Sequence, residues 1–217
     1  MELVGIALAR VVAFIEMQGL DPVGKISAPE GLQLLGDRYS FAKTPQTLAE
    51  IDFQKGVEFG VGKLGPINID KMTFYSNGLV IDTRSSTDDC EKVLQDFRDV
   101  FARRLGSNLN VSRRNLVSHV IFRSSLHLSL LNPLLEPIAA RLTSTVSKEV
   151  GQSVPYEPTL FALSPDLSQI KLDPIAFTIE RRAQVPFSEN MYFSSAPLQT
   201  NDHLDVLREV EASLTPR

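Results

Sequence analysis

The chain of 217 residues contains no tryptophan, only three histidines and a single cysteine, Cys90. One cysteine cannot form an intrachain disulfide, and it cannot supply the paired thiolates of a cysteine-based metal site. The histidines form no metal-binding motif either, since His119 and His127 are eight residues apart and no His-Glu-x-x-His sequence occurs. We therefore expect no metal site and no cofactor.

A strong charge bias and a long uninterrupted apolar run are also missing. The formal net charge is −4, the pI is about 5.4 and 43% of the residues are hydrophobic. A dedicated polyanion-binding protein would be basic overall, and a disordered chain would be less hydrophobic and more highly charged. Arg10 and Glu16 interrupt the apolar N-terminal stretch, so we expect neither a secretion signal nor a membrane span. The composition indicates a folded cytoplasmic protein that does not associate with membranes.

The clearest local pattern is a β-hairpin in residues 67–84. Asn77-Gly78 separates two runs of alternating apolar and polar residues, and this dipeptide favours a two-residue turn of type I′. Such a turn pairs Phe74 with Ile81. The apolar face of the predicted hairpin consists of Met72, Phe74, Leu79 and Ile81.

Hydrophobic periodicity predicts four helices and several further strands. The strongest helix pattern follows the hairpin, in residues 85–106. Ser86 or Thr87 can cap this helix, acidic residues begin it, and Arg103 and Arg104 end it. Its apolar stripe is Cys90, Val93, Leu94, Phe97, Phe101 and Leu105. We expect three other helices, at residues 28–37, from Asn132 or Glu136, and from Thr200 or Asn201. The second of these has the apolar stripe Ile138, Leu142, Val146 and Val150. Other strands are expected at residues 10–18, 116–123, 159–163, 170–182 and 189–195.

Two segments of the chain resemble each other. Residues 67–74 and 170–177 share the pattern Ile-x-aliphatic-Asp-x-aliphatic-x-Phe, and each precedes a strand, a Ser-Ser pair and a threonine-capped helix. We interpret the chain as two tandem β-α-β-β-β-α repeats, 1–111 and 112–217, within one continuous globular unit. The predicted fold class is α+β, with an antiparallel sheet, helices packed on one face and pseudo-twofold symmetry. The alternative is that alternating strands resemble one another by chance.

Residues 100–135 contain five arginines and no carboxylate, although the whole chain is acidic. Arginine binds carboxylate or phosphate through two parallel hydrogen bonds, so this composition is typical of a partner surface or an anion site. The alternative is a solvated surface that acids such as Asp96, Asp99 or Glu136 balance. The candidate binding residues are Arg103, Arg104, Arg113, Arg114 and Arg123.

Other residues that could carry chemistry favour structural roles. Cys90 lies on an apolar helical stripe, which indicates burial rather than a reactive thiolate. Ser118 and His119 are neighbours, so on a strand their side chains point to opposite faces. Asp70 and Asp173 occupy matching positions in the proposed repeats and could face each other as a carboxylate pair, although each also suits a turn. We assign no catalytic residue and no metal ligand.

The leading hypothesis is a non-catalytic cytoplasmic module for protein–protein interaction or assembly, which acts as a homo-oligomer or as a complex subunit. A first alternative is an anion-binding or nucleic-acid-binding protein that uses the arginine-rich segment 103–123, and its affinity would fall steeply with salt. A second alternative is an enzyme with a pocket between the two repeats. We favour a protein partner, including another copy of the chain, over nucleic acid.

Overall fold

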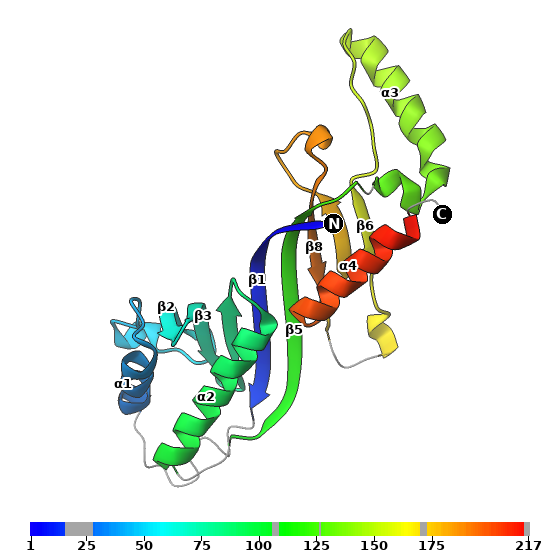
Figure 1. The fold of residues 1–217 in the computed structure, drawn as a ribbon. Coiled ribbons are helices and arrows are strands. Elements are labelled where there is room, and N and C mark those ends of the chain that lie inside the picture. The colour runs from blue at the N-terminus through cyan, green and yellow to red at the C-terminus, as the bar shows by residue number, and fades with distance from the viewer. Residues whose placement is uncertain (16–27, 106–108, 126, 170–172, 215–217) are drawn as a thin grey trace. The chain divides into compact units, whose positions relative to one another are not determined.

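The computed structural model describes residues 1–15, 28–105, 109–125, 127–169 and 173–214. Within these residues the fold is α+β, as predicted, with eight strands and four α-helices. The strands form one antiparallel sheet in the order β2-β3-β4-β1-β5-β8-β7-β6 (Figure 1). The strands are β1 (Glu2–Ile15), β2 (Val57–Leu64), β3 (Ile67–Tyr75), β4 (Gly78–Thr83), β5 (Val111–Arg123), β6 (Leu160–Leu163), β7 (Phe177–Arg181) and β8 (Met191–Ala196). The helices are α1 (Ala28–Tyr39), α2 (Thr87–Leu105), α3 (Glu136–Val150) and α4 (Thr200–Leu214).

The chain divides into two compact units. Unit 1 contains residues 1–5, 119–196 and 201–217, whereas unit 2 contains residues 6–118 and 197–200. Strands β1 and β5 therefore contribute residues to both units. The predicted repeats, 1–111 and 112–217, were defined by sequence similarity. The division into compact units therefore does not test them.

The predicted elements are present, but three strands differ in extent. The strand expected at 116–123 is longer, because β5 already begins at Val111. The strand expected at residues 10–18 begins much earlier, since β1 starts at Glu2, and residues 16–18 lie outside the described part of the chain. The strand expected at 170–182 is shorter, because β7 spans only Phe177–Arg181 and residues 173–176 have no strand structure. Residues 170–172 of that prediction are not described.

The core of unit 2 lies between its strands and the helices α1 and α2. Phe97 of α2 packs against Phe74 of β3, and the Cys90 thiol donates to the carbonyl of Ala9 in β1, at 3.3 Å. The predicted apolar stripe of α2 is buried as far as Phe101. A continuous series of ring contacts, with centroids 4.5–5.7 Å apart, connects Tyr39, Phe41, Phe59, Phe74, Phe97 and Phe101. Each such pair adds roughly 0.5–1.5 kcal/mol beyond the burial of apolar area.

The first turn of α2 is capped as the sequence predicts. Ser86 precedes the helix, and its Oγ accepts a hydrogen bond from the backbone N–H of Asp89 at 3.1 Å. This bond satisfies one of the donors that a helix N-terminus leaves without an intrahelical partner.

The β3–β4 hairpin has the predicted apolar face but a different register. Met72, Phe74, Leu79 and Ile81 are all buried. Phe74 pairs with Leu79 rather than with Ile81, so the turn is centred on residues 76–77 and the predicted register is wrong. A shift by two residues keeps every side chain on its original face, which is why the buried face was predictable while the turn was not.

Gly78 has a role in the hairpin other than the predicted one. Its φ is not in the left-handed region, so it does not serve a type I′ turn. Gly78 pairs with Phe14 of β1, and a Cβ at this position would lie 2.5 Å from the carbonyl oxygen of Ala13. Glycine is therefore required because β1 approaches β4 closely.

The helix α4 begins at Thr200, as predicted, and its residues from Asn201 onward belong to unit 1, where Leu204 and Leu207 are buried. Strands β5 and β8 contact each other through Phe122 and Tyr192, whose stacked rings have centroids 5.5 Å apart. The Glu211 carboxylate of α4 accepts hydrogen bonds from the chain's N-terminal ammonium and from the hydroxyl of Ser124. These contacts attach α4 to the strands of unit 1.

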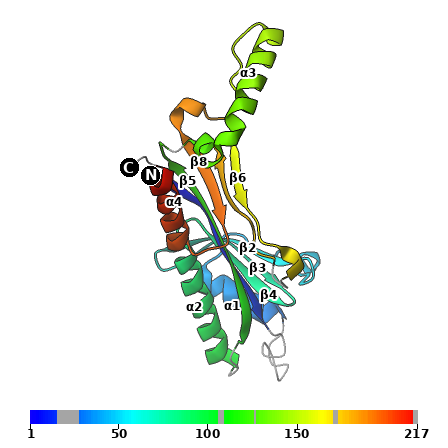
Figure 2. The same cartoon turned by 90° about the vertical axis from the view of Figure 1, so that its right-hand side faces the viewer.

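The helix α3 departs from the predicted arrangement. The prediction that all helices lay their apolar stripes on the sheet is wrong for α3, because none of its residues is buried. Figures 1 and 2 show α3 extending away from the strands of unit 1, with the following chain segment returning beside it toward β6. The four residues of β6 are themselves not buried, so this strand offers α3 no core to join.

Candidate interaction site

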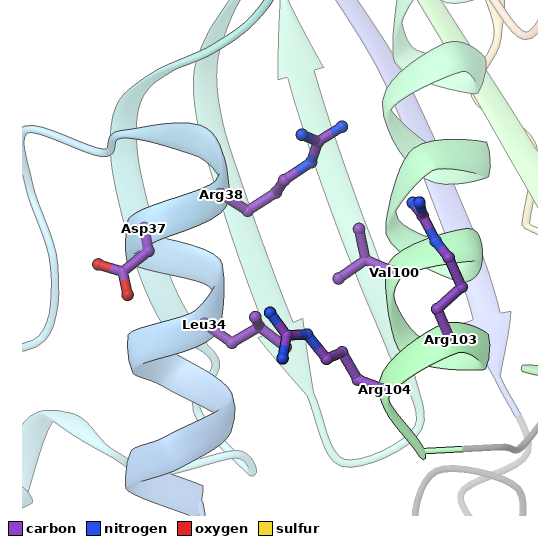
Figure 3. A pocket seen from close by; sticks show the side chains of 6 residues that line it. All are labelled: Leu34, Asp37, Arg38, Val100, Arg103 and Arg104. Atoms are coloured by element: carbon purple, nitrogen blue, oxygen red, sulfur yellow. The ribbon is translucent and has the colours of Figure 1, made fainter.

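The predicted arginines at the end of α2 line a cleft between α1 and α2. The cleft has a volume of about 440 Å³, and Arg103 and Arg104 form one of its sides. The remaining lining residues are Leu34, Asp37 and Arg38 of α1, and Val100 of α2 (Figure 3). Sequence reasoning missed Arg38, because it directly follows the helix predicted at 28–37 and lies far from Arg103 and Arg104 in the chain, so no local pattern linked the three arginines.

The arginines of this cleft differ in their partners. Arg38 forms a bidentate ion pair with Asp96, in which Nε and Oδ2 are 3.0 Å apart. Burial alone would raise the pKa of the Asp96 carboxyl, but the hydrogen bonds and charge of Arg38, together with contributions from Tyr39 and Arg103, lower this pKa. Arg103 donates from Nε to the backbone carbonyl of Asp99 at 3.1 Å. Arg104 forms no ion pair with any residue that the structure describes.

Side-chain directions make the cleft electropositive. In Figure 3, Arg38 extends from α1 toward α2, and Arg104 extends from α2 toward α1 beside Leu34. Asp37 points away from the cleft. Asp96 forms its ion pair with Arg38 and interacts more weakly with the charge of Arg103, whereas Arg104 has no ion-pair partner among the described residues.

Arg113 and Arg114 do not share this cleft. Both lie in β5, ahead of the strand predicted at 116–123, and neighbouring residues of a strand point to opposite faces. The Arg113 guanidinium lies 4.1 Å from the ring centroid of Phe14, as a cation–π contact. Arg114 pairs with Glu91 of α2, with Nη1 and Oε2 2.9 Å apart. Arg123 ends β5 and belongs to unit 1. The five predicted arginines therefore do not form one patch.

The helix α3 exposes a continuous apolar face. Leu134 of the preceding 3₁₀ turn (Pro133–Leu135) is 81% exposed, Ile138 is 57%, Leu142 44% and Val150 55% exposed. These residues and the half-buried Val146 are spaced by four, so neighbours in the series are adjacent on the helix surface. The stripe winds gradually around the helix, with Leu142 at its centre and Leu134 and Val150 toward its two edges. The stripe was predicted from the sequence, but its exposure was not.

A different face of α3 is covered by the returning chain. The hydroxyl of Ser147 accepts a hydrogen bond from the backbone N–H of Val154 at 2.9 Å, and that of Thr143 accepts one from Tyr156 at 2.8 Å. Gly151 ends the helix in the left-handed conformation, with φ of 73°, and lets the chain turn back. The returning chain thus orders α3 and leaves its apolar stripe uncovered.

The candidate nucleophile Cys90 is a structural residue. Burial raises the pKa of its thiol to about 12, so the thiolate is not available near neutral pH. The buried pair of Ser194 and His203 is also structural. The Ser194 hydroxyl donates to the carbonyl of Thr178 at 2.5 Å, so it accepts from His203 Nε2, which lies 2.8 Å away. An imidazole that donates to the serine cannot act as its general base.

The two predicted carboxylates do not occupy matching positions. Asp70 lies within β3 and pairs with Arg84, with Oδ2 and Nε 2.7 Å apart. Asp173 is exposed and precedes β7, outside any strand. Among the described residues, no group of three potential ligands could hold a metal ion.

Comparison with known proteins assigns no family to the chain. No protein-family model matches the sequence, and no curated protein matches it. In the described part of the chain, none of the helices has the length and apolar character needed to cross a membrane.

Proposed function

We propose that the protein is a non-catalytic assembly module that forms homodimers through the apolar stripe of α3. The observation that carries this proposal is the stripe itself. Ile138, Leu142, Val146 and Val150 lie along α3, Leu134 lies in the turn before it, and none of the five is buried. Exposed apolar surface that is ordered and contiguous is typical of protein interaction sites. The proposed setting is the cytoplasm, consistent with the composition of the chain.

The spacing of the stripe favours a second copy as its partner. The five residues are evenly spaced, with Leu142 at the centre. In an antiparallel pair of α3 helices, Leu142 meets its own counterpart and Ile138 lies near Val146, while Leu134 and Val150 lie at the edges of the interface. This pairing is self-complementary, as a twofold-symmetric interface requires. The helix also contains two acids and two bases, so two copies bring no net charge together.

The energy of this interface indicates a reversible dimer. Full burial of a Leu, Ile or Val side chain contributes about 1.5–3 kcal/mol. The stripe residues are roughly half exposed, so the ten of two copies together contribute about 7–15 kcal/mol, which is comparable with the estimated ~4–15 kcal/mol cost of association. Because the gain is close to the cost, we expect a weak, reversible dimer whose population rises with protein concentration.

The proposal includes a tandem repeat. The order β-α-β-β-β-α occurs twice, as β1-α1-β2-β3-β4-α2 and as β5-α3-β6-β7-β8-α4. The strands β1 to β4 of the first repeat correspond to β5 to β8 of the second. If each strand is replaced by its counterpart, the order of the sheet becomes the same order read from the opposite edge. The N–H groups of Thr87 and Thr200, which begin α2 and α4, donate to each other's Oγ1 at 3.0 and 2.8 Å. These observations support duplication with a pseudo-twofold axis.

If the chain is a tandem repeat, the exposed helix α3 can be compared with its equivalent in the other repeat. Its equivalent helix α1 buries Leu35 and Tyr39 in the core of unit 2. We infer that the stripe of α3 is buried by a neighbouring copy. The match between residues 67–74 and 170–177 supports the repeat less well, since Phe74 lies near the end of β3 whereas Phe177 begins β7.

Light scattering after gel filtration, over a range of protein concentrations, tests the proposal. The parent chain should change from monomer to dimer, and Leu142→Asp should remain a monomer because it places two carboxylates at the centre of the interface. Ser144→Asp is the matched control, since Ser144 is exposed on the opposite side of the same helix. A parent chain that stays monomeric, or equal dimerisation of both variants, would contradict the proposal.

A further inference from the structure

We propose that the cleft between α1 and α2 binds a small organic molecule that carries a phosphate group. The phosphate lies between Arg38, Arg103 and Arg104, and the organic part rests on Leu34 and Val100. This inference concerns unit 2 and does not depend on dimerisation through α3. Of the predicted arginines, only Arg103 and Arg104 belong to this site, and Arg38 joins them.

The charge balance of the cleft favours a phosphate over a carboxylate ligand. The carboxylate of Asp96 already binds the Arg38 guanidinium through two parallel hydrogen bonds. Two further guanidinium groups remain on the other side of the cleft, and the carboxylate of Asp37 is turned away from them (Figure 3). A doubly charged tetrahedral oxyanion offers several acceptor oxygens in different directions, so it can engage more than one guanidinium fork at a time.

Size and lining indicate a small molecule. The cleft volume of about 440 Å³ falls within the range of small-ligand sites, and it exceeds what a bare phosphate would fill. Leu34 is partly exposed and supplies most of the apolar surface between the arginines, since Val100 is only 7% exposed. The lining residues include no aromatic ring on which a nucleic-acid base could stack, and the chain is acidic overall. Both observations disfavour single-stranded nucleic acid as the ligand.

The first experiment titrates the full chain with inorganic phosphate and with phenyl phosphate, by calorimetry at low salt. Both probes should bind, and phenyl phosphate should bind more tightly because its ring contacts Leu34 and Val100. Absence of heat with both probes would overturn the proposal. Equal affinities would contradict the role of the apolar lining, and tighter binding of a single-stranded oligonucleotide would replace the small molecule with nucleic acid.

Variants then locate the site. Arg104→Gln should weaken phenyl phosphate binding by about tenfold or more, the loss expected when a hydrogen bond to a charged group is removed. Arg104→Lys keeps the charge but not the fork, so it should restore binding only in part. Arg123→Gln is the matched control, because it removes the same charge from an exposed position in unit 1. Equal weakening by Arg104→Gln and Arg123→Gln would show a general charge effect and overturn the site.

Phosphate binding in the cleft and dimerisation through α3 can be tested separately. Leu142→Asp should bind phenyl phosphate as the parent chain does, whether or not the parent chain dimerises. Thermal unfolding of each arginine variant should match that of the parent, since Arg104 is exposed and forms no ion pair with a described residue. A folded Arg104→Gln variant that binds phenyl phosphate with parental affinity would overturn the proposal.

Discussion

The helices α2 and α3 have similar sequence patterns but different surroundings. Each carries an apolar stripe with residues three or four apart, acids near its start and a base near its end. In α2 the stripe joins the aromatic core of unit 2, whereas in α3 every residue remains at least partly exposed. Periodicity therefore predicts that a helix is amphipathic, but not whether its apolar face is covered by the same chain. That second property determines whether the helix stabilises the fold or recruits a partner.

The sharpest test of this contrast compares core and stripe truncations. Phe97→Ala should lower the free energy of unfolding by about 3–5 kcal/mol, because Phe97 is 1% exposed and contacts two other rings. Leu142→Ala should change it by no more than about 0.5 kcal/mol in the monomer. Urea denaturation of dilute protein measures both. A loss of several kcal/mol for Leu142→Ala would mean that α3 packs within its own chain.

Acid should destabilise unit 1 through His203 of α4. Burial, with a smaller contribution from His119, lowers the pKa of His203 to about 4, against about 6.5 in an unfolded chain. Between these values the unfolded state binds more protons, so stability present above about pH 6.5 is lost as the pH falls, up to about 3 kcal/mol. Urea denaturation at several pH values tests this expectation. His203→Gln should remove most of the pH dependence, and an unchanged slope in this variant would refute the assignment.

Two glycines should respond differently to the same substitution. Gly78→Ala should cost roughly 1–3 kcal/mol, since its Cβ would meet a backbone carbonyl that has little freedom to move. Gly151→Ala should cost only about 1 kcal/mol, because it places alanine in the left-handed region, in open space. Chemical denaturation compares the two. If Gly78→Ala were neutral, the close approach of β1 to β4 would not explain that glycine.

Local chemistry explains which features could be predicted from the sequence. The cap at Ser86, the stripe of α2 and the apolar face of the hairpin each depend on residues close in the chain, and all three are confirmed. The hairpin register was mispredicted because Asn77-Gly78 suits a turn on local grounds. The close approach of β1 that accounts for Gly78 comes from residues more than sixty positions earlier.

The candidate site was less predictable, for a related reason. Arg103 and Arg104 were identified by composition, but their cleft exists only because α1 places Arg38 opposite them. Arg113 and Arg114 are close to them in sequence, yet strand alternation directs one toward Phe14 and the other toward Glu91. Composition locates charge along a chain, whereas the pairing of distant elements decides which charges share a site.

The central claim is that the stripe of α3 pairs with the same stripe of a second copy. Cysteine cross-linking tests it most directly, because the native Cys90 is buried and a new cysteine on α3 would be the accessible thiol. Leu142→Cys should form a disulfide-linked dimer rapidly on mild oxidation, since antiparallel pairing brings the two copies of residue 142 together. Ile138→Cys and Ser144→Cys should cross-link slowly, the first because residue 138 faces residue 146 and the second because it points away from the interface. Equal cross-linking rates for all three variants would contradict the claim.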